Sequence, residues 1–119
     1  MTTPLHQLKA EFFKTLGHPV RIRVLELLSR REHSVAELLA LVAVESPNLS
    51  QQLAVLRRAG LVTVRREGAS AYYALTSPQV AELLAVARTI LTTVLTGQVG
   101  LLTDLNAEAP PPVRRRRAG

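Results

Sequence analysis

The sequence of 119 residues contains no cysteine and no tryptophan, and only two tyrosines and two phenylalanines. Without cysteine, the chain can form neither a disulfide framework nor a metal site with thiolate ligands. It also has no glycine-rich phosphate loop and no cluster of histidine, aspartate and serine that would suit nucleophilic catalysis. We therefore do not expect an enzyme, and the lack of cysteine fits a reducing compartment.

Targeting signals and long apolar runs are missing as well. The first residues, MTTPLHQLKAEFFKTL, lack the basic segment and following apolar run of a signal peptide. No uninterrupted apolar stretch approaches the ~20 residues that a membrane span needs. We expect a soluble, cytoplasmic protein that does not enter a membrane.

Positive charge exceeds negative charge, but it is unevenly distributed. The formal net charge is +6, of which Arg114–Arg117 supply four charges. Residues 107–119 are rich in proline and arginine and are expected to form a disordered tail, which leaves residues 1–106 as one domain. Within that domain, residues 46–66 carry four arginines and no acidic residue. Such a local cluster is typical of a surface that binds phosphates.

Periodicity and capping residues predict five helices and one hairpin. Helices are expected over residues 5–16, from Pro19 to about 28, over 35–42, over 47–59, and from Pro78 to about 105. Two β-rich segments, 61–64 and 71–75, flank a turn. A helix capped by Ser34 and Glu37, a short turn, a second helix and a basic hairpin together form a helix-turn-helix with a wing. The expected fold is mainly α, a winged helix-turn-helix of about five helices and a two-stranded wing.

The helix over residues 47–59 has an apolar face and a polar face. Leu49, Leu53 and Leu56 share the apolar face and should anchor the helix to the core. Asparagine and glutamine can pair with base edges in the major groove, whereas serine and arginine often bind phosphates and fix the register. The expected base contacts are Asn48, Gln51 and Gln52, and the expected phosphate contacts are Ser50, Arg57 and Arg58. The alternative is an ordinary solvated amphipathic helix, which the neighbouring capped helix and hairpin make less favoured.

The hairpin contributes two further arginines, Arg65 and Arg66. They point to opposite faces of one strand, so only one can easily face DNA unless the hairpin twists strongly. Both are candidate DNA contacts, with simple solubility as the alternative. Of Tyr72 and Tyr73, one is expected to pack inward, and the other could reach a phosphate.

Two segments resemble the ArsR/SmtB family of winged-helix transcriptional regulators. Leu16–Arg23 is similar to the start of the family's second helix, and Asn48–Val62 to its recognition helix and the beginning of its wing. The resemblance covers residues 16–105 and implies a homodimer joined through the first and last helices. Independently, the last helix carries more apolar surface than a small domain can bury. The expected dimer contacts are Leu5, Leu8, Phe12, Leu84, Leu91, Val94, Leu95 and Leu102.

Many members of this family sense metals, but the chain departs from the family's two metal sites. The resemblance places Ser34 and Ala36 where one site has cysteines. It places Ser77, Gln79, Ile90 and Thr93 where the other has aspartate, histidine and glutamate, so both sites are absent. A hybrid site is a further hypothesis, in which His6, with Asp104 or Glu108 across the dimer and His33 as another candidate, would suit Ni²⁺ or Zn²⁺. The alternative is that these histidines are ordinary surface residues, and His18 is expected to be structural.

The expected function is that of a dimeric, sequence-specific DNA-binding regulator. The resemblance implies that the helix over residues 47–59 enters the major groove of a palindromic promoter operator and that repression is the default. A metal, another effector or none could control it, and no cofactor is required. The alternative function is a winged-helix module that binds another protein.

Overall fold

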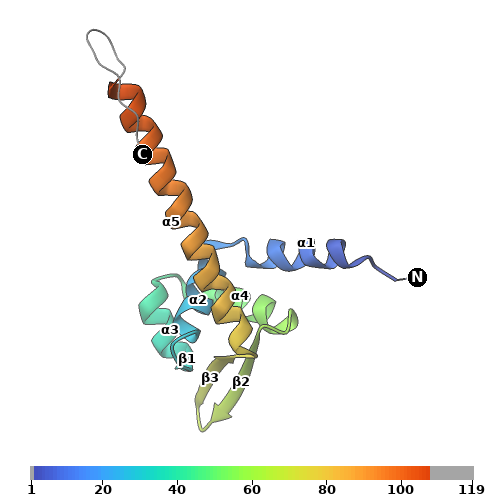
Figure 1. Cartoon of the computed structure of the whole chain (residues 1–119). Helices are drawn as coiled ribbons and strands as arrows, with labels where there is room; N and C mark the ends of the chain where they lie inside the picture. The colour runs from blue at the N-terminus through green and yellow to red at the C-terminus, as the bar shows by residue number, and fades with distance from the viewer. Residues whose placement is uncertain (1, 108–119) are drawn as a thin grey trace. The chain divides into compact units, whose positions relative to one another are not determined.

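The structure is a computed structural model that describes residues 2–107. The elements in chain order are α1 (Leu5–Leu16), α2 (Pro19–Leu28), β1 (His33–Ser34), α3 (Val35–Val42), α4 (Ser46–Arg58), β2 (Val62–Glu67), β3 (Ser70–Leu75) and α5 (Pro78–Ala107) (Figure 1). The five predicted helices are confirmed, with ends that agree within two residues. Apart from Ala107, the expected tail over residues 107–119 lies outside the described residues.

The chain divides into two compact units. The first ends at Glu82 and contains α1 to α4, the sheet and the first turn of α5. The second begins at Leu83 and, over its described residues, is the rest of α5. The helix-turn-helix and the wing therefore belong to the same compact unit, so their positions relative to one another are defined.

The sheet has three antiparallel strands rather than the two that the sequence predicted. Strand β3 lies in the middle, with β1 on one side and β2 on the other (Figure 1). In β1, His33 pairs with Tyr73 and Ser34 with Tyr72. A two-residue strand carries no periodic signal, so sequence patterning could not detect it. Strand β1 attaches the residues before α3 to the middle of strand β3 in the wing.

The core of the first unit is built around α2. Four of its apolar side chains are buried: Val24, Leu25, Leu27 and Leu28. This helix contacts α3, α4 and β3. From α3 and α4 the core receives Leu38, Leu49, Leu53 and Leu56, which are almost completely buried. The buried leucines thus pack α3 and α4 against α2, and the other side of α4 faces solvent.

Local signals set the ends of these helices. Ser34 Oγ accepts a hydrogen bond from the Glu37 N–H, and the Glu37 carboxylate accepts one from the Ser34 N–H, so the predicted capping box is confirmed. At the other end of α3, Ala43 adopts a left-handed backbone with φ of 59°. Left-handed backbone ends the helix there and directs the short turn into α4.

We expect the charge of Glu37 to make stability depend on pH on the acid side. The Ser34 N–H and then the Arg31 guanidinium hold the pKa of Glu37 below its ordinary value of 4.5. Because the folded pKa is the lower one, this carboxylate stabilises the native state above the unfolded value, and the contribution is lost as pH falls through the folded value. The substitution Glu37→Gln keeps an acceptor at this position but removes the charge.

The variant should therefore be less stable than the parent at neutral pH, and the two should converge as pH falls through the lowered pKa of Glu37. Thermal unfolding followed by circular dichroism between about pH 3 and 7 measures this. Parallel curves for parent and variant would show that the charge of Glu37 does not contribute.

Candidate nucleic-acid interface

Helix α4 is anchored by its leucines and turns a polar face to solvent. Leu49, Leu53 and Leu56 are buried, as their spacing predicted. The opposite side exposes four of the predicted DNA contacts, Ser50, Gln51, Arg57 and Arg58, while Asn48 is half-buried in the first turn. Since no acidic residue lies within α4, this face offers hydrogen-bond donors and positive charge to a ligand.

Gln52 is not available to read a base, which corrects the sequence prediction. Its side chain is only 6% exposed. The Arg21 Nε–H donates to Gln52 Oε1 at 2.8 Å, and Gln52 Nε2 donates to Asn48 Oδ1 at 2.9 Å. At the edge of the buried stripe, a slight rotation of the helix decides whether a side chain faces solvent or core, and spacing alone does not resolve that rotation. Gln52 is therefore a support for α4.

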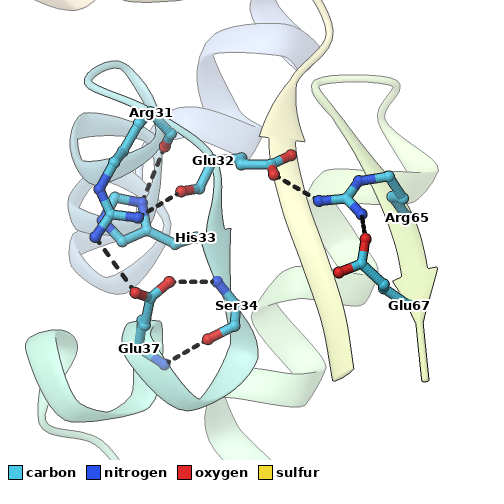
Figure 2. A network of polar contacts seen from close by, with 7 residues as sticks. All are labelled: Arg31, Glu32, His33, Ser34, Glu37, Arg65 and Glu67. Carbon is cyan, nitrogen blue, oxygen red and sulfur yellow. Dashed lines mark hydrogen bonds and ion pairs between the residues drawn. The ribbon is translucent and has the colours of Figure 1, made fainter. Parts of the chain in front are cut away.

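Arg65 of the wing is engaged within the protein. Its two terminal nitrogens lie 2.6 Å from a Glu32 carboxylate oxygen and 2.6 Å from a Glu67 carboxylate oxygen (Figure 2). Its guanidinium also lies over the Tyr72 ring, 4.7 Å from the centroid. The hydrogen bonds that Arg65 donates to Glu32 and then to Glu67 raise the pKa of Arg65. Two carboxylates pair with this exposed arginine and hold the wing against the segment before α3, while its predicted DNA contact stays a prediction.

Arg66 faces a different environment from its neighbour. It is exposed, and within residues 2–107 its side chain forms no hydrogen bond or ion pair. The two wing arginines therefore differ in their surroundings, while the prediction that only one of them faces DNA stays a prediction. Arg66 is accordingly the wing residue best placed to meet a phosphate.

An open hollow lies between α4 and β3. It has a volume of about 450 Å³ and is lined by Ser50, Ala54, Arg57, Arg58 and Tyr73. Both arginines predicted to bind phosphates thus line the same hollow, together with a serine and a tyrosine. Arginine and hydroxyl groups are the usual donors to phosphate oxygens. Tyr73 belongs to this set by tertiary position alone, because it lies on the central strand rather than on the helix.

The predicted metal residues lie in different surroundings, and their site across a dimer stays a prediction. Within residues 2–107 there is no group of three histidine or acidic side chains that could hold an ion. His33, predicted as an exposed histidine or a ligand, is instead buried in β1, where its Nδ1–H donates to the Arg31 carbonyl at 2.9 Å (Figure 2). His6 is exposed on α1, Asp104 is half-buried on α5, and Glu108 lies outside the described residues.

His18 has the structural role that the sequence predicted. It is the N-cap residue of α2, and its Nδ1 accepts a hydrogen bond from the Val20 N–H at 3.2 Å. The next residue, Pro19, is the first of the helix, where a missing N–H costs no hydrogen bond. The Nδ1 atom of His18 therefore caps the N-terminus of α2.

Apolar side chains on α1 and α5 are exposed to solvent in the single chain. Leu91 and Leu95 are 58% and 57% exposed. Four other predicted dimer contacts are exposed as well: Leu5, Leu8, Val94 and Leu102. Phe12 is half-buried. The last of the set, Leu84, is half-buried too. By length and composition α5 could cross a membrane, although threonines and a glutamine interrupt its apolar residues. The run of exposed apolar side chains along α5, called here the apolar stripe, is typical of a surface that packs against a partner.

Known proteins share both the sequence and the fold of this chain. A family model described as a helix-turn-helix domain matches residues 16–65. The HTH-type transcriptional regulator Rv0081 of Mycobacterium tuberculosis (strain ATCC 25618 / H37Rv) is 60% identical over 105 residues, which cover 87% of this chain and 92% of that protein. The crystal structure of M. tuberculosis Rv0081 aligns with a TM-score of 0.76, covering 82% of this chain and 99% of that one.

Two further relatives are described by function or assembly. A biofilm growth-associated repressor of Xylella fastidiosa (strain Temecula1 / ATCC 700964) is 42% identical over 84 residues, covering 71% of this chain and 74% of that protein. The solution structure of a homodimeric winged helix-turn-helix DNA-binding domain from Mycobacterium bovis has a TM-score of 0.66 at 28% identity. That alignment covers 77% of this chain and 91% of the other.

The exposed face of α4, the hollow beside it and the basic wing define a winged helix-turn-helix DNA-binding protein. The chain belongs to the ArsR/SmtB family of transcriptional regulators. It is not an enzyme, as the sequence predicted.

Proposed function

We propose that this protein is a homodimeric repressor that binds a palindromic operator, with one α4 in each of two successive major grooves. The observation that carries the proposal is the hollow beside α4, which Arg57, Arg58, Ser50 and Tyr73 line together with Ala54. Phosphates seated there would fix the register of α4 on the duplex. Asn48 and Gln51, on the first turns of the helix, would then face base edges.

A second copy of the chain is the proposed occupant of the apolar stripe on α5. The polar threonines Thr89 and Thr93 lie on the side of α5 opposite Leu91 and Leu95, so polar residues interrupt the apolar surface on that side, where the exposed Val86 also lies. A lipid environment favours a helix that is apolar on every side, whereas a subunit interface needs one stripe. The homodimeric relative from M. bovis supports the same assembly. A soluble dimer in the cytoplasm follows from this assignment.

The operator can be found by selection from a pool of randomised duplexes. The parent should enrich a two-fold symmetric sequence whose half-sites are about one helical turn apart. The variant carrying Asn48→Ala and Gln51→Ala should lose that discrimination but keep binding that weakens steeply with salt. Failure of the parent to enrich any sequence, combined with weak dependence on salt, would favour the alternative of a protein-interaction module.

Control by Ni²⁺ or Zn²⁺ would require a site shared by two subunits. The family's own positions do not fit, because Ser34 is committed to the capping box and Ala36, Gln79, Ile90 and Thr93 include no carboxylate or imidazole. The remaining proposal places His6 of one subunit with Asp104 or Glu108 of the other. Calorimetric titration of the dimer should then show stoichiometric binding that His6→Ala abolishes. Equal binding by parent and variant would overturn this site, and no binding by either would point to another effector or to none.

A further inference from the structure

Three polar side chains form a continuous relay from α2 to the DNA-facing side of α4. Arg21 donates through Nε to Gln52 Oε1 at 2.8 Å, and its Nη1 donates to the Thr15 carbonyl at 3.0 Å. Gln52 Nε2 in turn donates to Asn48 Oδ1 at 2.9 Å. Gln52 is buried, whereas Asn48 reaches the half-exposed start of α4.

The direction of every hydrogen bond in this relay is fixed by Arg21. A guanidinium can only donate, so the carbonyl oxygen of Gln52 must face it. The Gln52 amide nitrogen must then donate to Asn48. Asn48 must accept through its oxygen, because two amide nitrogens cannot form a hydrogen bond with each other. Asn48 consequently directs its Nδ2 amine away from Gln52. Within residues 2–107, that amine has no hydrogen-bond partner.

We propose that Arg21 and Gln52 are positioning residues that make Asn48 a donor toward DNA, an inference that rests on the proposed function of α4. An asparagine that reads adenine in the usual bidentate way must accept from the N6 amine and donate to N7. Here the hydrogen bond from Gln52 turns the oxygen toward Gln52, and although that oxygen keeps a second lone pair, the bidentate contact needs oxygen and amine side by side facing the base. The group directed away from Gln52 is the amine. The base edge that fits is guanine, whose N7 and O6 are neighbouring acceptors within reach of the two hydrogens of one amine. Asn48 therefore selects guanine in each half-site.

The unaltered protein provides a direct test. Selection from randomised duplexes with the parent and with Asn48→Ala identifies the operator position whose preference depends on Asn48. That position should be guanine in the parent, and replacing it by 7-deazaguanine, which lacks the N7 acceptor, should weaken binding about tenfold. A position that is adenine and depends on its N6 amine would overturn the inference, and so would a selection that Asn48→Ala leaves unchanged.

The substitution Gln52→Glu tests the relay itself. The new carboxylate can accept from Arg21 but cannot donate to Asn48, so the asparagine amide should turn its amine inward and its oxygen toward DNA. The selected base should then change from guanine to one that presents an amine, cytosine or adenine. Gln79→Glu, the same chemical change at an exposed position at the start of α5, should leave the guanine preference intact. An unchanged guanine preference in the Gln52→Glu variant would overturn the role of the relay.

A measurement without DNA separates the failure of the relay from the failure of the proposed function. The Arg21 Nε–H, held by a buried acceptor, should give a resolved, slowly exchanging signal in a ¹⁵N-correlated spectrum of the parent. The signal should disappear in a Gln52→Leu variant, and its absence from the parent would overturn the relay. If the signal is present but the parent enriches no sequence, the proposed function fails and the specificity inference fails with it.

Discussion

Replacing Leu91 and Leu95 with aspartate should convert the protein to a monomer and abolish tight operator binding. Both side chains are more than half exposed in the single chain, and they lie one turn apart on the same side of α5. Four buried carboxylates at a two-fold interface would have no compensating partners, and their desolvation is costly. Because a dimer binds two half-sites at once, loss of the second subunit should lower operator affinity by about a hundredfold or more.

Sedimentation equilibrium measures the assembly, and titration of the selected operator measures the affinity. The matched control carries Thr89→Asp and Thr93→Asp, which add the same charge at the same spacing on the opposite side of α5. Those hydroxyls bond only to backbone carbonyls of their own helix, so the control should stay dimeric. The first unit has its own core in α2, α3 and α4, so the leucine variant should still unfold cooperatively. A dimeric leucine variant would show that this stripe is not the interface.

The second large effect is expected from removing Arg57 and Arg58 together. These arginines line the hollow beside α4, and a dimer presents four of them. Each phosphate contact contributes about 0.9 to the slope of log affinity against log salt concentration, so the slope should fall by about 3 to 4 in Arg57→Ala with Arg58→Ala. Near 0.1 M salt, this corresponds to roughly a thousandfold loss of affinity. The preferred operator sequence should stay the same, because phosphate contacts do not distinguish bases.

Fluorescence anisotropy with the operator at several salt concentrations gives both quantities. The control Arg23→Ala with Arg30→Ala removes the same total charge from exposed positions that neither line the hollow nor belong to α5. It should keep the parent slope. Equal loss of slope in both variants would mean that net charge, rather than the hollow beside α4, provides the electrostatic attraction.

Most of the fold was predictable because its signals are local. Proline at the first position of α2 and the Ser34–Glu37 capping box each depend on residues within about one turn. The leucine spacing in α4 likewise identifies the buried side of that helix without any knowledge of its partners. The resemblance to the ArsR/SmtB family rests on the same continuous segments, and it correctly indicated the class of protein.

The errors concern residues whose roles depend on distant partners. Gln52 was predicted to face DNA, but Arg21, 31 positions away along the chain, holds it in the core. His33 was predicted to be either a metal ligand or an exposed residue, but its position in β1, paired with Tyr73, buries it in the sheet. Arg65 stays a candidate DNA contact, but its pairing with Glu32, 33 positions away, was likewise not predicted. In each case the residue type allowed several environments, and the fold selected one.

The sequence by itself therefore determined the helices, the hairpin, the basic character of residues 46–66 and the apolar stripe of α5, because backbone propensity and side-chain period act over a few residues. Only the tertiary structure decided which of the polar side chains in that region remain available to a ligand. The buried amide of Gln52 is committed by its hydrogen bond from Arg21, since an unsatisfied polar group in the core costs free energy. The exposed guanidinium of Arg65 is instead engaged by surface ion pairs with Glu32 and Glu67. These contacts leave Asn48, Gln51, Arg57, Arg58 and Arg66 on the side of the protein that the proposed function requires.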